Sequence, residues 1–180
     1  MKVFINSMIA FLAKKSTLIA SLIFASIMFV LVMFVINPVI DGGNGIGVIQ
    51  LQLSFDKLAG IKIIESWGEG AIQRFKQWIF TDYIYAFSYA LFLASILSTL
   101  IIKSRLVKVS IYKYVPLMPF LAGLLDWLED SMELFFMHDM QGYSEVLFTI
   151  HSLVASAKFA FILLSFIFII IFWAKKKEHD

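Results

Sequence analysis

The chain contains no cysteine and only three prolines among its 180 residues. The absence of cysteine excludes disulfides, thiolate metal sites and cysteine nucleophiles. No phosphate-binding glycine loop, G-x-S-x-G elbow or HExxH motif is present, so three familiar kinds of enzyme site have no support in the sequence. Charged residues make up only 16%, and the net charge of +2 is too small to suggest a nucleic-acid partner.

Apolar residues are what the chain has in excess. They make up 61% of it, and the mean hydropathy is +0.88. Soluble domains have roughly 45–50% apolar residues. A single domain of this size has too little interior to hide so much apolar surface, which indicates that lipid is its solvent.

Long apolar stretches predict an all-α integral membrane protein with a bundle of four transmembrane helices. The hydrocarbon core of a bilayer is roughly 30 Å thick, which a helix of about 20 residues crosses. The expected spans lie at about 17–37, 80–102, 114–137 and 146–173. A cleaved signal peptide is the alternative reading of the first stretch, but that stretch exceeds the usual signal core and no small-x-small cleavage site follows it.

The distribution of basic residues predicts the orientation. The connection at 138–145 has no lysine or arginine, whereas three other segments are rich in them: the first fifteen residues, the 103–113 connection and the C-terminal tail. Cytoplasmic segments carry such an excess. We therefore expect both termini to lie in the cytoplasm, with the protein in a bacterial inner membrane, and the long 38–79 connection to lie outside.

Outside the expected spans, the patterns predict short elements. Residues 3–12 fit an interfacial helix. A period-two alternation predicts a short strand, with its apolar side formed by Ile49, Leu51, Leu53 and Phe55. Asp56 is placed to cap a helix over 57–67, and a second amphipathic helix leads into the 80–102 span. These helices would either rest on the lipid headgroups or form a lid over a cavity.

The third expected span carries an unusual set of acidic residues. They are spaced i, i+3, i+4, i+7 and therefore share one helix face: Asp126, Glu129, Asp130 and Glu133. Each acid near a helix centre costs on the order of 3 kcal/mol on insertion scales. That face must turn toward the other helices or a wet cavity. Pro116 and Pro119 stand at the start of this span, where a helix tolerates proline.

Other spans offer partners at matching depths. Lys158 and His151 are seven residues apart, so they lie on one stripe of the fourth span. Counting along antiparallel helices sets Lys158 level with Asp126, and His151 level with Glu133. On the second span, a further polar stripe is formed by Asp82, Tyr85 and Tyr89. We expect the second to fourth spans to enclose this site, with the first span more peripheral.

The charges of this cluster do not balance. Five carboxylates face one lysine and one histidine, and like charges so close together in a low dielectric cannot all ionise. One reading of the cluster is a set of buried pairs that lock the helices in register. Its excess acid instead favours a missing positive charge: protons in transit, a metal ion or an amine-bearing ligand.

A divalent metal is one candidate for that charge. The candidate ligands are Glu129, Glu133 and His151. Carboxylates with one histidine suit ions such as Mg²⁺, Mn²⁺ or Fe. The Glu-x-x-His pattern of di-iron bundles is absent, because Glu133 and His138 are five residues apart.

Two stretches resemble recurring segments of a loose group of uncharacterised bacterial four-helix membrane proteins. They are residues 82–89 (Asp-Tyr-Ile-Tyr-Ala-Phe-Ser-Tyr) and 121–130 (Leu-Ala-Gly-Leu-Leu-Asp-Trp-Leu-Glu-Asp). In that group the second segment often reads Asp-x-x-Glu-Asn, and Asp130 stands here in place of the asparagine. The resemblance implies membrane topology and transfers no activity.

These observations predict a site for a lipid, or for a small amphipathic or cationic molecule, open toward the outer side. Asp126 and Lys158 would form its floor, and the remaining acids with His151 its wall. If the site is catalytic, a buried carboxylate or His151 is the expected acid–base group. Two alternatives stay open: a component of proton or cation translocation, and an accessory subunit that docks on another membrane protein. The sequence does not decide whether the chain forms a homo-oligomer.

Overall fold

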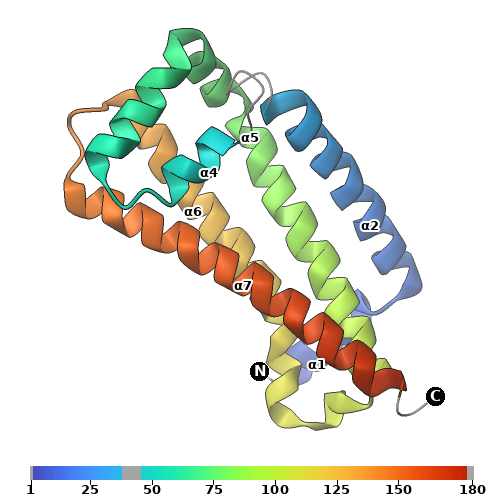
Figure 1. Ribbon diagram of the computed structural model, residues 1–180. Helices are drawn as coiled ribbons and strands as arrows, with labels where there is room; N and C mark the ends of the chain where they lie inside the picture. Colours follow the sequence, from blue (N-terminus) through green and yellow to red (C-terminus); the bar gives the residue numbers. More distant parts are fainter. Residues whose placement is uncertain (1, 38–45, 178–180) are drawn as a thin grey trace.

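The computed structural model describes residues 2–37 and 46–177, and these residues contain helices and no strand (Figure 1). Residues 38–45, at the start of the expected outer connection, lie outside the described part. The elements are α1 (Lys2–Leu12), α2 (Lys15–Val30), the π-helical turn η1 (Leu31–Ile36), α4 (Ile46–Gln52), α5 (Lys57–Lys103), the 3₁₀ segments η2 (Leu106–Lys108) and η3 (Ser110–Leu117), α6 (Met118–His138) and α7 (Glu145–Lys177).

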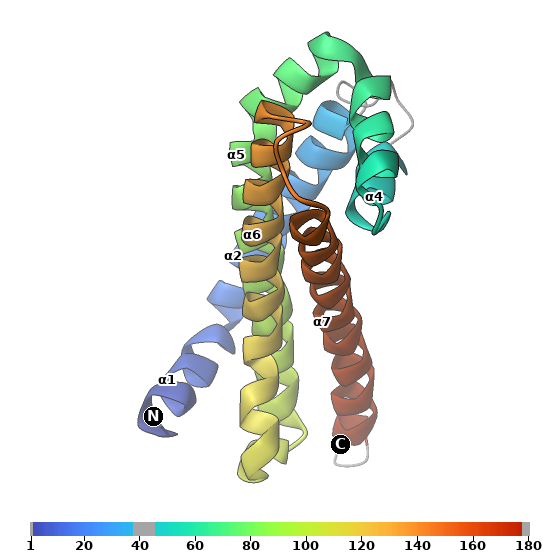
Figure 2. The ribbon, with the colours of Figure 1, turned by 90° about the vertical axis from the view of Figure 1, so that its left-hand side faces the viewer.

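Three helices are long and apolar enough to cross a membrane: α2 with η1, α5 and α7. The fourth long helix, α6, packs against both α5 and α7, but its four acidic residues set it apart from the other three. Helix α1 and the last turns of α7 lie at one end of the molecule, and α4 lies at the other (Figures 1 and 2). We call these the α1 end and the α4 end.

Helix α5 begins where Asp56 caps it, as expected. The Asp56 carboxylate accepts a hydrogen bond of 2.7 Å from the backbone N–H of Ala59. Gly68 interrupts the helix with φ of 75°, a left-handed conformation that favours glycine. The chain bends there and then continues without a further break to Lys103. The predicted helix over 57–67 and the amphipathic helix that follows are therefore both present.

The strand predicted around Ile49–Phe55 is wrong. Residues 46–52 form helix α4, with Leu51 fully buried and Ile49 48% exposed. The backbone N–H of Phe55 donates to the Ser152 hydroxyl on α7 at 3.2 Å. A lone strand would have left its backbone groups without partners, whereas a helix pairs them internally.

The start of the third predicted helix also differs from expectation. We expected an α-helix from residue 114, but 110–117 form a 3₁₀ segment and α6 begins at Met118. Pro119 stands in the first turn of α6, where its missing N–H loses no helical hydrogen bond. Nearby, α1 does not only lie along the surface. Its Ile5 and Ile9 are buried in a core with Leu97 and Phe172 at the α1 end.

Two glycines set the distances between helices. A methyl group on Gly60 would lie 2.3 Å from the Phe148 ring of α7, and one on Gly123 would lie 3.3 Å from both the Ala86 carbonyl and the Ala90 side chain of α5. Gly60 therefore lets α5 fold down onto α7 at the α4 end. Gly123 brings α6 close to α5 beside the acidic face.

Candidate functional site

The acidic face of α6 is buried against its neighbours. Its four residues, Asp126, Glu129, Asp130 and Glu133, are at most 6% exposed. The opposite face, with Leu124 and Leu128, is about half exposed. The helix thus turns its charges inward and its leucines outward, as its sequence period requires.

Lys158 of α7 is the cationic centre of the site. Its ammonium Nζ donates to Asp126 Oδ1 at 2.8 Å and lies 2.6 Å from Glu129 Oε2. Tyr89 of α5 donates its hydroxyl to the other oxygen of Asp126, Oδ2, at 2.9 Å. The predicted pairing of Lys158 with Asp126 is confirmed, and three helices meet at this one carboxylate.

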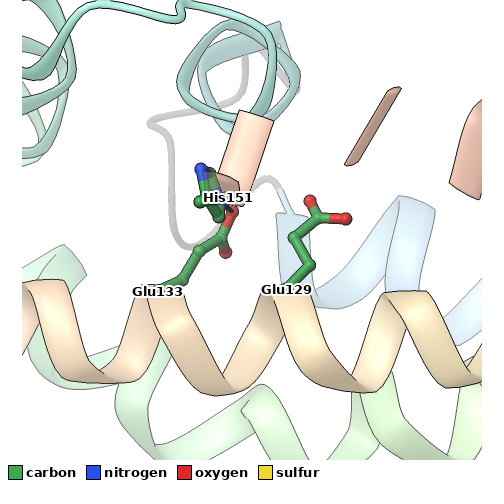
Figure 3. Close-up of side chains that lie close together, drawn as sticks. All are labelled: Glu129, Glu133 and His151. Atoms are coloured by element: carbon green, nitrogen blue, oxygen red, sulfur yellow. Dashed lines mark hydrogen bonds and ion pairs between the residues drawn. The ribbon is translucent and has the colours of Figure 1, made fainter. Parts of the chain in front are cut away.

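His151 forms the second pair, one level nearer the α4 end. Its Nε2 lies 3.2 Å from Glu133 Oε1, which confirms the other predicted pairing. Figure 3 shows the His151 ring facing Glu133, with Glu129 pointing into the same region from the next turn of α6. The rings of Phe136 and Phe148 lie 5.3 and 5.5 Å from the imidazole, so water is excluded on that side.

Several polar atoms of the cluster lack a hydrogen-bond partner within the described chain. They are Glu129 Oε1, Asp130 Oδ2, Glu133 Oε2 and His151 Nδ1. Leaving such a buried group unsatisfied costs about 1–3 kcal/mol, and more when it is charged. The two confirmed pairs therefore do not satisfy the cluster.

A cavity of about 850 Å³ runs beside the Asp126–Lys158 pair, between α2, α5 and α7. Its polar lining lies at the α4 end and in the middle, and is formed by Asn37, Gln52, Asp82, Tyr85, Tyr89, Asp126 and Lys158. Toward the α1 end the lining is apolar, with side chains such as Phe92, Ile96, Phe166 and Ile169. The cavity is thus amphipathic along its length.

The cavity is open at its side. Helices α2 and α7 each pack against α5. Phe29 of α2 and Phe166 of α7, which line the cavity, are 45% and 51% exposed. An apolar molecule can therefore reach the cavity between α2 and α7.

The structure separates the predicted site residues into two groups. Asp82, Tyr85, Tyr89, Asp126 and Lys158 line the cavity. The other four, expected as its wall, lie behind Lys158 and are fully enclosed: Glu129, Asp130, Glu133 and His151. The cluster expected from sequence is therefore divided into an open half, which lines the cavity, and a closed half, which is enclosed behind Lys158. The contact of Lys158 with Glu129 joins the two halves.

Sequence reasoning missed one wall of the cavity and its covering helix. The first span was expected to be peripheral, but α2 packs on α5 and contributes several lining residues. Helix α4 contributes Gln52, which is only 5% exposed. Helical spacing of Val48, Leu51 and Gln52 was the signal for α4. Between Ser21 and the end of α2, Ser26 is the single polar residue on the cavity side, and Asn37 follows the helix after η1.

Sequence reasoning also missed the residue that fastens the α4 end. Lys57, at the start of α5, donates to the backbone carbonyls of Tyr143 at 2.6 Å and Gln141 at 3.1 Å. The Lys57 Nζ also lies 4.8 Å from the centre of the Tyr143 ring. These contacts tie the first part of α5 to the connection between α6 and α7.

Comparison with protein-family models, with curated proteins and with solved structures gives no match.

Proposed function

We propose that the chain spans a bacterial inner membrane four times, through α2, the second part of α5, α6 and α7, with both termini in the cytoplasm. Three of these helices are apolar enough to cross a membrane, and α6 keeps its acids inside the bundle. Helix α1 and the end of α7 lie at the same end of the molecule (Figure 2), as an even number of crossings requires. The basic 103–113 connection is at that end too, which supports placing it in the cytoplasm.

Within this bundle, we propose that the protein binds an amphipathic molecule in the cavity between α2, α5 and α7. The observation that carries the proposal is the form of the cavity: charged and hydrogen-bonding at Asp82, Asp126 and Lys158, and apolar toward Phe166 and Ile169. Its volume of about 850 Å³ lies in the range of small-molecule sites, roughly 300–1,000 Å³. A polar head would lie at the first group and a hydrocarbon tail along the second.

The charges favour a head group that is cationic or rich in hydrogen-bond donors. Lys158 already faces two carboxylates, so it has little positive charge to offer an anion. Asp82, by contrast, makes no hydrogen bond or ion pair with any described residue. The rings of Tyr85 and Tyr89 meet edge to face at 5.5 Å in the cavity wall, and aromatic faces attract cations. An amine-bearing lipid fits this surrounding better than a purely anionic one.

Translocation of protons or cations is the weaker alternative. No charged residue lines the described cavity beyond Lys158 toward the α1 end, where Phe92, Ile96 and Ile169 form the walls. The hydroxyl of Ser95, at this depth of α5, donates to the carbonyl of Leu91 in its own helix. A single chain therefore offers no continuous polar path across the bundle.

The test is native mass spectrometry of the protein released from mild detergent, with two tryptophan substitutions on α7. Ile162 lines the cavity, whereas its neighbour Leu163 is 61% exposed outside it. We expect an adduct of constant mass on the native chain and on Leu163→Trp. It should be absent from Ile162→Trp, whose larger ring fills the apolar part, and weaker in Asp82→Asn.

Lipid extraction and fragmentation of the adduct would identify its head group. Circular dichroism and size-exclusion chromatography would verify that each variant is folded. A native chain without adduct, or an adduct held equally by all folded variants, would contradict the proposal.

A further inference from the structure

The enclosed half of the cluster has the arrangement of a metal site. Glu129, Glu133 and His151 each offer one ligand atom, and these atoms lie within 4.8 Å of one another. The two glutamates are one helical turn apart on α6, and the histidine comes from α7. All three are completely buried, and none of them lines the amphipathic cavity.

Unpartnered atoms point to a ligand at this position. Glu129 Oε1 and Glu133 Oε2 have no hydrogen-bond partner in the described chain, and Figure 3 shows both glutamates and His151 directed into one space. A simple His151–Glu133 ion pair would leave these atoms unsatisfied in a dry interior. A bound cation would give the free oxygens a partner.

The local charge leads to the same conclusion. The buried α6 face carries four carboxylates, and the cations that contact it from α7 are Lys158 and His151. Even with a protonated histidine, the anions outnumber the cations. One divalent ion bound by neutral His151 would offset most of this excess, because the four carboxylates and Lys158 would otherwise leave three negative charges.

We propose that Glu129, Glu133 and His151 bind a divalent ion of the first transition row. An imidazole beside two carboxylates suits Mn²⁺, Fe²⁺ or Zn²⁺, whereas Ca²⁺ and Mg²⁺ take oxygen ligands. Metal–ligand bonds of 2.0–2.2 Å separate two ligands by at most about 4 Å. Small side-chain rotations therefore close the site.

Two neighbouring contacts hold the ligands ready. Lys158, 2.6 Å from Glu129 Oε2, restrains that glutamate, and the rings of Phe136 and Phe148 fix the imidazole plane. Contacts of this kind around the ligands orient them and tune the metal. Three protein ligands leave at least one coordination position free for a small molecule.

The experiment measures the metal content of the full chain, purified in detergent without chelator. We expect about one transition-metal ion per chain by mass spectrometry of the acid-digested protein. In His151→Gln and Glu133→Gln the content should fall at least about tenfold. Asp130→Asn is the matched control: it removes a buried carboxylate from the same face of α6 but is not one of the three ligands, and it should keep the ion.

A second measurement holds even if the ligand variants fail to fold. Native protein is stripped with chelator and titrated with Mn²⁺, Fe²⁺ or Zn²⁺, and its melting temperature should rise with at least one of them, because a ligand of the folded state stabilises it. Co²⁺ should add absorption bands of a protein-bound ion. A native chain that carries no ion and responds to none of these metals would overturn the proposal, as would equal loss in Asp130→Asn. The lipid adduct is scored separately, so either proposal can fail without the other.

Discussion

Replacing Lys158 with methionine is the sharpest test of how the polar cluster is held together. The ammonium group lies 2.8 Å from Asp126 Oδ1 and 2.6 Å from Glu129 Oε2, and the side chain is 5% exposed. Methionine keeps the length and apolar stem of lysine but removes the charge. Two buried carboxylates would then lose their only close cation among the described residues.

The expected effect is large. Removing one partner of a buried ion pair costs about 3–5 kcal/mol, because a charge remains buried without compensation. For a chain of this size, each kcal/mol lowers the melting temperature by about 2–4 °C, which predicts a fall of about 6–20 °C. Tryptophan fluorescence of the protein in detergent would follow melting. Wild type and variant should be heated at one rate, since irreversible unfolding makes the midpoint depend on that rate.

A rescue experiment separates charge from packing. Adding Asp126→Asn and Glu129→Gln to Lys158→Met replaces the whole ion set by neutral groups of similar size. Because Glu129 is also a proposed metal ligand, all variants are compared after treatment with chelator, and the triple variant should regain more than half of the lost stability. Leu163→Met, on the exposed side of α7, serves as the control and should change little. If Lys158→Met melts within about 2 °C of wild type, or the triple variant melts lower still, the buried ion set does not contribute as argued.

Two further predictions concern packing and orientation. Gly60→Ala should destabilise the fold by about 1–3 kcal/mol, because the added methyl group would collide with the ring of Phe148. Gly70→Ala should stabilise the fold by about 0.5–1 kcal/mol, because a methyl group there meets only the Arg74 side chain within 4 Å. Thermal melting that ranks the two variants the other way would contradict this packing. Because the chain has no cysteine, Gln141→Cys and Lys108→Cys can each be labelled alone. A membrane-impermeant maleimide on intact cells should label the first and not the second, and the opposite result would invert the proposed topology.

Regular helix geometry made much of the polar site predictable. The spacing of the four acids alone placed them on one face of α6. Because antiparallel helices advance by equal steps, counting residues from the ends of α6 and α7 was enough to pair Lys158 with Asp126, and His151 with Glu133. Charged groups have few acceptable positions in an apolar bundle, so their period and depth carry strong information.

The apolar segments carried much less information about secondary structure and about which helix face is buried. The alternation around Ile49 and Leu51 fits a strand and a short helix almost equally well over seven residues, and only tertiary contacts decide between them. Leu51 enters the core at the α4 end, and Phe55 is held through its N–H by Ser152 of α7. Likewise, apolar residues surround α2 on all sides after Thr17 apart from two serines, so no sequence period could show that one of its faces lines the cavity.

The acids of α6 connect the assembly of the bundle to its proposed function. On insertion scales, four acids cost on the order of 10 kcal/mol, which exceeds what the apolar residues of this 21-residue helix regain at about 0.5 kcal/mol each. The helix therefore needs Lys158 and His151 of α7 beside it, and the short connection between α6 and α7 keeps them together. Yet two cations balance the charge of only two acids. A helix selected only to pack against α7 would need no further acids. The surplus acid consists of Asp82 in the cavity and the carboxylates with unpartnered oxygens behind Lys158. This surplus raises the free-energy cost of inserting and packing the helices, and its unpartnered oxygens form no hydrogen bond within the described chain. A ligand that brings positive charge, an amine in the open half and a metal ion in the closed half, gives that surplus a physical reason.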